Sequence, residues 1–416
     1  MGRTAMRAAV GAGVLLWLAI AGCGEKTVKD RPRAADSVSS GGDEPAPAPP
    51  ASQPAPAFTS VAAGHNFTCG IAGGGVLYCW GRNEFGQLGD GSRDQRALPV
   101  AVGTKARWRA VAPGGSHTCA LTAEGAAYCW GSGLSGQLGN DIAGASPTPV
   151  KVGGVPPFAE IASGDDHTCA LTSGGALWCW GENRHGELGH GDTLRARGPE
   201  EAAPGTAFRA IALASHSTCG LTAASKLYCW GLDNGGALGY TASLRCEEPI
   251  NTPNWCSTSL HRTGDTLLFA HAVLGFEHGC GVTADGEAFC WGRNVQGELG
   301  SGSRDSAGPG PVQADARFTL LAAGSGFTCG VTTIGELYCW GTNADGQTGS
   351  GAGADATTPS RVESELKFVS VTAGFDHACA LTTEHEVFCW GSNFYGQLGG
   401  DVKRRSFVPT AVVFPQ

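Results

Sequence analysis

Short runs of alternating apolar and polar residues recur along the chain from Phe58 to its end, separated by glycine-rich turns. One such unit reads A-V-A-P-G-G-S-H-T-C-A-L-T-A-E-G-A-A-Y-C-W-G and continues, after a loop, with G-Q-L-G and T-P-V-K-V. Alternation with a period of two predicts β-strands, and the glycine turns between them predict hairpins. The pattern therefore indicates a repeated, all-β unit.

The repeat is counted most easily by its cysteines, which come in pairs ten residues apart. Successive pairs begin 50, 50, 50, 61, 49 and 50 residues apart. Seven copies at this period predict a seven-bladed β-propeller with one blade per copy. The pairs are Cys69–Cys79, Cys119–Cys129, Cys169–Cys179, Cys219–Cys229, Cys280–Cys290, Cys329–Cys339 and Cys379–Cys389.

The register of each hairpin follows from one assumption, that the two cysteines face each other. Leu121 then faces Ala127, and residues 123–125 form a three-residue loop. The last position of such a loop favours a left-handed residue, and glycine adopts this conformation without strain. Glycine occupies it in five of the seven copies, whereas Ser225 and His385 occupy it in the other two.

Directly opposed cysteines in a non-hydrogen-bonded pair are close enough to be bridged. Zinc is the alternative, but nine intervening residues match no common spacing of zinc ligands. We therefore expect one disulfide in each of the seven hairpins. Cys246 and Cys256 are also ten apart, in the one enlarged segment between repeats (residues 240–266), and should cross-link that insertion.

The N-terminus carries the features of an export signal. Arg3 and Arg7 precede an apolar run over residues 8–20, which is shorter than the ~20 residues of a membrane-spanning helix. The sequence Ile-Ala-Gly-Cys that ends at Cys23 resembles the lipobox of bacterial lipoproteins, which implies cleavage before Cys23 and a diacylglycerol on its sulfur. The alternative is an ordinary signal peptide. We expect residues 1–22 to be removed, and the protein to be exported and lipid-anchored to the bacterial cell envelope (outer membrane, on its periplasmic or surface face).

Residues 23–57 predict a disordered tether, because residues 24–57 hold seven prolines and almost no large apolar side chains. Residues 58–416 form the propeller. The full chain has a net charge of −9, and loss of Arg3 and Arg7 with the signal leaves 26 bases against 37 acids, or −11. Such acidity disfavours nucleic acid as a partner. We expect a monomer whose only attachment to the membrane is the lipid.

Two segments of the repeat, A-x-G-x-x-H-T-C-A-L and L-Y-C-W-G-x-N-x-x-G-Q-L-G, resemble the repeat of the regulator of chromosome condensation family. Good copies are residues 162–171 with 177–189 and 373–381 with 387–399. The resemblance covers residues 58–416 and implies seven blades of four short antiparallel strands. It leaves function open, since the founding nuclear member exchanges nucleotide on a small GTPase whereas others bind proteins. An exported, acidic chain is not expected to perform the exchange reaction.

Two residue types recur at fixed repeat positions. Tryptophan follows the second cysteine in every copy, at positions 80, 130, 180, 230, 291, 340 and 390. A carbohydrate-binding platform is one interpretation, but a fixed packing residue is simpler. Histidine occupies another position in four copies (His117, His167, His278, His377), where Phe67, Phe327 and Ser217 stand in the others. Since phenylalanine cannot ligate a metal, we expect structural histidines that bond to a neighbouring turn rather than a metal ring.

The two residues before that position vary between copies, as loop tips do. In the resembled family these loops line one face around the axis and contact partners. Asp166 and Asp376 match the acid-before-histidine pattern that some members use for binding, and Glu277 nearly matches it. We predict a partner site at these tips, against the alternative of plain solvated loops. Its residues are Asp165, Asp166, Phe276, Glu277, Phe375 and Asp376, in which two aromatics stand beside acids.

A second candidate for recognition is Trp255, inside the insertion and next to Cys256. A loop closed by its own disulfide loses less conformational entropy on binding, and exposed tryptophans are frequent at binding hot spots. The alternative is that the insertion covers the outer edge of a blade.

The sequence contains none of the common motifs for nucleophilic catalysis, nucleotide binding, zinc proteases or EF-hands. We therefore expect neither cofactor nor metal, and a binding scaffold that presents one propeller face to a protein or envelope polymer. The alternatives are a propeller enzyme, a lyase or hydrolase of polysaccharide, and a structural component of the envelope.

Overall fold

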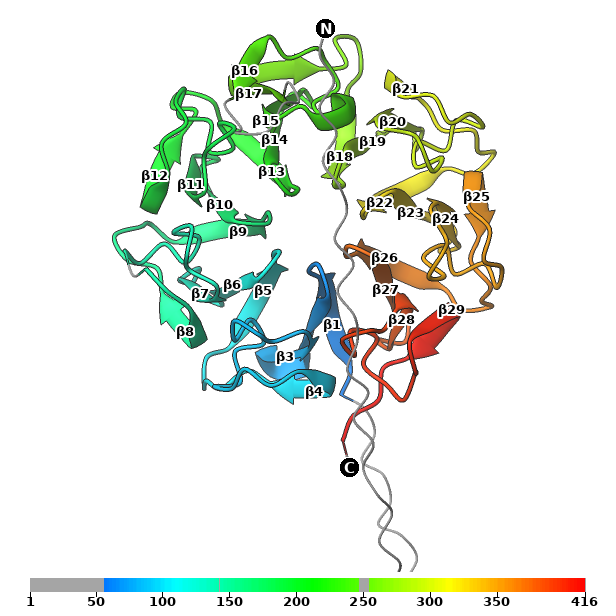
Figure 1. The fold of residues 1–416 in the computed structure, drawn as a ribbon, viewed down its shortest axis with the longest axis horizontal. Coiled ribbons are helices and arrows are strands. Elements are labelled where there is room, and N and C mark those ends of the chain that lie inside the picture. Colours follow the sequence, from blue (N-terminus) through cyan, green and yellow to red (C-terminus); the bar gives the residue numbers. More distant parts are fainter. Residues whose placement is uncertain (1–55, 142, 247–253, 416) are drawn as a thin grey trace, which may run out of the picture. The chain divides into compact units, whose positions relative to one another are not determined.

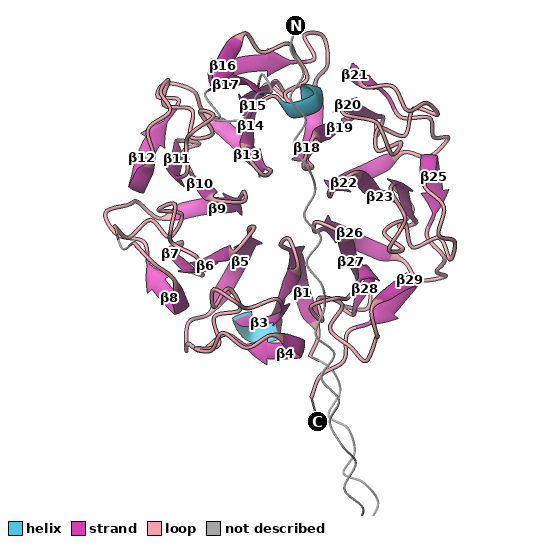
Figure 2. Ribbon diagram, viewed as in Figure 1, coloured by secondary structure: helices cyan, strands magenta, loops and turns pink. Residues whose placement is uncertain are grey.

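The computed structural model describes residues 56–141, 143–246 and 254–415. In this part of the chain, twenty-nine strands form seven antiparallel sheets arranged radially around an axis (Figure 1). Helix is confined to two short 3-10 turns, η1 (Gly73–Gly75) and η2 (Asn234–Gly236), as Figure 2 shows. None of the helices described is long and apolar enough to span a membrane. The predicted seven-bladed all-β propeller is confirmed, whereas Cys23, the signal (1–22) and nearly all of the tether (23–57) lie outside the described residues.

Each blade is one four-stranded meander, apart from one blade with a fifth strand. The innermost strands are β1 (Phe58–Ala63), β5 (Trp108–Pro113), β9 (Phe158–Ser163), β13 (Phe208–Leu213), β18 (Phe269–Leu274), β22 (Phe318–Ala323) and β26 (Phe368–Ala373). The second strands are β2 (Phe67–Ala72), β6 (His117–Thr122), β10 (His167–Thr172), β14 (Ser217–Thr222), β19 (His278–Thr283), β23 (Phe327–Thr332) and β27 (His377–Thr382).

The third strands are β3 (Val76–Gly81), β7 (Ala127–Gly131), β11 (Leu177–Gly181), β15 (Leu227–Leu232), β20 (Ala288–Gly292), β24 (Leu337–Gly341) and β28 (Val387–Ser392). The outer strands are β4 (Arg96–Ala101), β8 (Ser146–Lys151), β12 (Ala196–Ala202), β17 (Asn254–Thr263), β21 (Ala307–Pro311), β25 (Ala356–Arg361) and β29 (Arg405–Ala411). The fifth strand, β16 (Leu244–Cys246), pairs with β17 beyond the rim of the fourth blade.

The predicted register of the hairpins is confirmed in every blade. Cys119 faces Cys129 and Leu121 faces Ala127, and the same pairing recurs between the second and third strands of the other six blades. The Cα atoms of the seven cysteine pairs lie 4.0 to 4.1 Å apart, at disulfide distance. The third loop position is left-handed throughout, with φ of 85° at Gly125 and, despite their Cβ atoms, 61° at Ser225 and 65° at His385.

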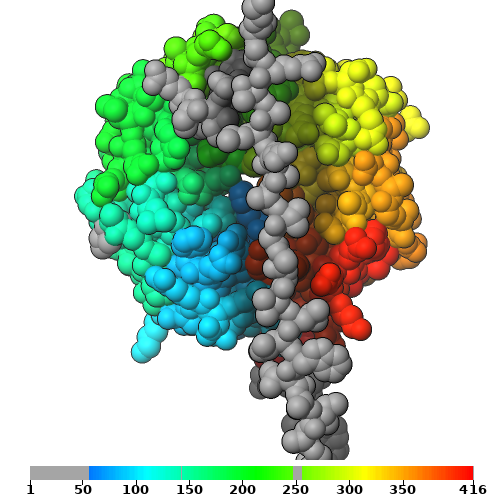
Figure 3. Space-filling view, in the orientation of Figure 1, coloured from blue at the N-terminus to red at the C-terminus, as the bar shows by residue number. Residues whose placement is uncertain are grey.

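The seven repeated tryptophans hold neighbouring blades together. Every one of these side chains is fully buried, and its indole N–H donates a hydrogen bond of 2.9 Å to a backbone carbonyl in the G-x-L-G turn of the preceding blade. Trp130, for example, donates to the carbonyl of Gln87. Figure 3 shows the adjoining blades in continuous contact. The core role predicted for these tryptophans is confirmed.

The four repeated histidines also bridge blades. The Nε2 atom of each lies 2.8 to 2.9 Å from a threonine hydroxyl of the next blade, in the pairs His117–Thr168, His167–Thr218, His278–Thr328 and His377–Thr68. Each threonine donates its own proton to the carbonyl that accepts the tryptophan, so the histidine N–H is the donor to the threonine. The expected structural role is correct, and the hydrogen-bond partner shared by all four histidines is a threonine on a strand of the next blade.

The ring closes without a shared sheet, because every blade is built from one continuous segment of the chain. The first and last blades meet through the same contacts that join the others: Trp80 donates to the Gln397 carbonyl, and His377 bonds Thr68. In addition, the Phe58 amide donates to the His385 carbonyl over 2.9 Å. The seam between the chain ends is therefore an ordinary blade interface.

Candidate functional site

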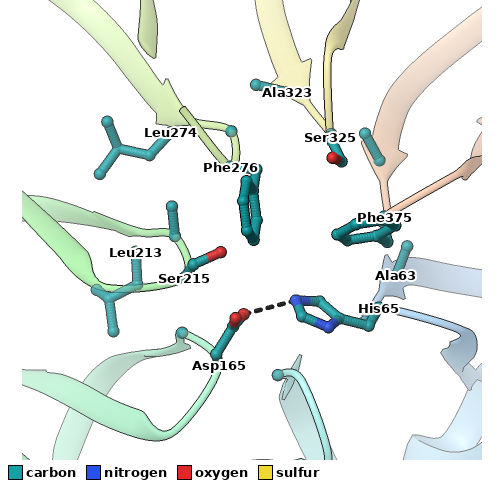
Figure 4. A pocket seen from close by; sticks show the side chains of 18 of the residues that line it. Ala63, His65, Asp165, Leu213, Ser215, Leu274, Phe276, Ala323, Ser325 and Phe375 are labelled. Carbon is teal, nitrogen blue, oxygen red and sulfur yellow. Dashed lines mark ion pairs between the residues drawn. The ribbon is translucent and has the colours of Figure 1, made fainter. Parts of the chain in front are cut away.

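The loops between the innermost and second strands of all seven blades converge on one end of the axis. They enclose a pocket of about 110 Å³ (Figure 4). Backbone hydrogen bonds of 3.0 to 3.2 Å join most tips to the adjacent tip, among them those from the Phe276 amide to the Gly324 carbonyl and from the Phe375 amide to the His65 carbonyl. This linkage makes the pocket a pre-formed feature of the fold, which lowers the entropy cost of binding there.

Two polar side chains, those of His65 and Asp165, reach across the pocket from blades that are not adjacent. His65 Nε2 lies 2.5 Å from Asp165 Oδ1, a contact that Figure 4 marks with a dashed line. Burial raises the pKa of Asp165, but the hydrogen bond and charge of His65 outweigh burial, so the net shift is downward. Asp165 is therefore an ionised carboxylate that is already paired.

Two aromatic side chains, Phe276 and Phe375, also line the pocket. The rings of Phe276 and Phe375 are arranged edge to face with centroids 5.6 Å apart, and Phe375 also lies 5.3 Å from the His65 ring. The two phenylalanines are 39% and 38% exposed. Exposed aromatics held in a fixed arrangement at the mouth of a pocket are typical of binding hot spots.

The three other predicted acids stand one residue further along their loops and point away from the axis. The amide of Gln137 donates to Asp166 over 2.7 Å, and that of Gln397 donates to Asp376 over 3.3 Å. Burial raises the pKa of both acids. Glu277 accepts hydrogen bonds from Asn234 and Arg293. These acids fasten the tips to the outer loops and do not line the pocket.

Trp255 is separated from the axial loops by the width of a blade. It belongs to β17, and Figure 1 shows β16 and β17 at the rim while β13 lies next to the axis. Its side chain is 42% exposed and lies under the Arg245 guanidinium, 5.9 Å from ring centroid to Cζ. The Cα atoms of Cys246 and Cys256 are 5.9 Å apart. The insertion thus extends the outer edge of the fourth blade, and its tryptophan is a separate surface.

Comparisons with known proteins agree with this geometry. The sequence profile of the RCC1-like domain matches residues 19–317, and profiles of the regulator of chromosome condensation (RCC1) repeat match residues 318–347, 335–381, 368–397 and 384–416. The chain belongs to the RCC1-like family. No curated protein matches it.

Solved structures share the RCC1-like fold at low sequence identity. Prp20p from Saccharomyces cerevisiae, described with its binding to Gsp1p and histones, is 21% identical, with a TM-score of 0.71 over 82% of this chain and 87% of that one. The same yeast protein with Kap60 bound gives 22% identity and 0.68 over 81% and 83%. Human WBSCR16 gives 22% identity and 0.68 over 78% and 86%. At this identity, the likeness establishes the fold alone.

Ser215 and His65, which both line the pocket, do not form a nucleophile–base pair. Ser215 hydrogen-bonds to Asp165, and Asp165 is paired in turn with His65. The carboxylate therefore lies between the serine and the imidazole, so that the imidazole is not the group bonded to the serine hydroxyl, as a serine nucleophile would require.

The structure also brings together three residues that the sequence reasoning did not single out. His185, Glu187 and His216 converge where the third blade meets the fourth. The signal was present in the repeat: Glu187 replaces glutamine in G-Q-L-G, and histidines occupy two variable positions around it. Because these positions lie in different repeats, only a fold that places successive blades side by side reveals the cluster.

Proposed function

We propose that this RCC1-like protein is a lipid-anchored, extracytoplasmic binding scaffold. It binds a protein partner near the axis of the loop face, which is the face that carries the loops between the innermost and second strands. The observation that carries the proposal is the half-exposed pair Phe276 and Phe375 in a pre-formed pocket. Binding of protein partners by Prp20p, to which this chain is similar in fold, supports a binding role.

Sequence features support the location. The lipobox at Cys23, the tether that follows it and the density of paired cysteines all suit a protein held outside the cytoplasm. A tether of about 35 residues, at ~3.1 Å per residue where it adopts the polyproline conformation, would let the propeller reach a partner well away from the membrane.

A photoreactive phenylalanine analogue at position 375 of the full chain, in living cells, tests which face binds. We expect a specific cross-link to a protein from position 375. The matched control is the same analogue at Ile334, which is 66% exposed in the hairpin turn between β23 and β24, at the opposite end of its blade. A cross-link to the same protein from position 334 but not from 375 would show that the partner binds the other face.

A further inference from the structure

A second site lies outside the axial pocket, at the junction of the third and fourth blades. His185 and Glu187 come from the turn between β11 and β12, and His216 comes from the loop between β13 and β14. His185 Nδ1 is 2.9 Å and His216 Nδ1 is 3.6 Å from the same oxygen, Glu187 Oε1. One donor atom from each residue lies within 4.8 Å of the others.

The backbone fixes this cluster from within the core. The backbone carbonyl of Glu187 accepts hydrogen bonds from the Thr218 hydroxyl and the Trp230 indole. In its side chain, Oε2 accepts a hydrogen bond of 2.9 Å from the His185 backbone amide. The side chain of Glu187 is fully buried. Oε2 thus performs the turn-forming role that glutamine has in four other repeats, as the Gln87 side chain does toward the Phe85 amide. Oε1 remains directed at the two imidazoles.

The three ligand-type residues coincide at one blade junction among those described. The corresponding triplet is Phe85, Gln87 and Ser116 at the first junction, and Gln296, Glu298 and Gly326 at the fifth. The fifth junction thus has a buried glutamate, Glu298, but neither histidine. Glutamine or glutamate occupies this position in six of the seven repeats and Ala237 in the fourth, so the repeat does not need a carboxylate between two imidazoles.

The spacing and chemistry of the donors suit a divalent transition metal. Zinc binds imidazole nitrogen and carboxylate oxygen at ~2.0–2.2 Å, which in a tetrahedron places the donors roughly 3.3–3.6 Å apart. The two histidine nitrogens lie 2.9 and 3.6 Å from Glu187 Oε1, near this range, and the donor atoms of all three residues lie within 4.8 Å of one another. Nitrogen and oxygen ligands of this kind favour zinc and its neighbours over calcium or magnesium.

We propose that His185, Glu187 and His216 bind a divalent transition metal of the zinc class, with at least one coordination position left for water or a partner's side chain. The cation would take the place of the protons that the two imidazoles share with the carboxylate. Asp165 and Asp166 act electrostatically on His216 and add negative charge around the site. Since His216 is 32% exposed in its side chain, a metal can enter from the loop face.

Metal titration of the full chain after chelator treatment tests the proposal. Zinc should bind with a stoichiometry of one and raise the melting temperature, and Co²⁺ should give the absorption of a low-coordinate nitrogen–oxygen site. Glu187→Gln keeps the turn-forming oxygen found at Gln87 and Gln137 and should weaken zinc binding at least 100-fold. His216→Ser introduces the serine that stands at the equivalent position 116, and it should also weaken zinc binding at least 100-fold.

Glu298→Gln is the matched control, because it makes the same change at a junction without histidines, and zinc affinity should be unaltered. The proposal is overturned if the wild-type chain binds no zinc. It is also overturned if Glu187→Gln and His216→Ser bind zinc as the wild type does, since the metal would then sit elsewhere. A purely structural triad would lower the stability of the metal-free variants while leaving wild-type melting insensitive to zinc. None of these outcomes bears on the axial pocket.

Discussion

Reduction of its disulfides should leave this protein unfolded under conditions in which the oxidised protein is folded. The cysteine pair within each blade closes a loop of about ten residues. Such a cross-link contributes on the order of 2–3 kcal/mol to stability by restricting the unfolded chain. Seven such contributions together exceed the roughly 5–15 kcal/mol by which a domain is normally stable. The hairpin register places all seven pairs where these bonds can form.

Circular dichroism with and without dithiothreitol measures this effect, and peptide mapping of unreduced protein checks the pairing. Because the cysteines of the seven blade pairs are at most 1% exposed, these bonds should be reduced in the folded protein only as fast as it opens. For a single blade, replacement of Cys169 and Cys179 by alanine should lower the free energy of unfolding by about 2–3 kcal/mol. An unchanged melting temperature in reductant, or pairing between different repeats, contradicts the assignment.

The protein should also lose stability steeply as the pH falls from about 6.5 to 4, because four buried histidines resist protonation. Burial lowers the pKa of His117 and His377 to about 3, and that of His167 and His278 to about 4. The folded pKa thus lies below the value of about 6.5 in the unfolded chain, so that in this window the unfolded state binds protons that the folded state does not. Each histidine then lowers the free energy of unfolding by up to ~1.4 kcal/mol per pH unit, and all four together lower it by up to about 5 kcal/mol per pH unit.

Phenylalanine at the same repeat position provides the matched variant, since Phe67 and Phe327 already fill it in two blades. His117→Phe should lose the hydrogen bond to Thr168 at every pH. Relative to wild type it should gain about 2 kcal/mol between pH 7.5 and pH 5, because one proton-binding group is gone from the unfolded chain. Urea unfolding at the two pH values gives the difference. An identical pH dependence in both proteins would show that His117 is protonated in the folded state.

Much of the fold could be predicted because the repeat carries its own register. A constant cysteine spacing and, in five of the seven copies, a glycine at the left-handed loop position fix which residues face each other. The antiparallel pairing of Cys119 with Cys129 therefore has an equivalent in every blade. The tryptophan at a constant position could be assigned to the core for the same reason. Because the spacing recurs, the prediction made for one copy of the repeat applies to all seven.

The site was harder to predict, because adjacent residues of a loop tip point in different directions. The sequence shows Asp165 and Asp166 as equal candidates, yet Asp165 faces the axis while Asp166 is bound to Gln137 in the preceding blade. His65 was not among the predicted site residues, and its role depends on a contact across the pocket with Asp165 that no local pattern contains. Which loop-tip residues face each other across the axis is determined only when the seven blades are assembled into the ring.

Whether the partner binds at the axial end of the loop face can be decided by measuring the affinity of the captured protein for three variants of the full chain. Phe276→Ala combined with Phe375→Ala should weaken binding about thirtyfold, which is ~2 kcal/mol, with little change in melting temperature. Trp255→Ala at the rim and Ile334→Ala on the opposite face should bind as the wild type does. Full affinity in the double variant, with loss in either of the other two, would show that the partner binds at the rim or on the opposite face.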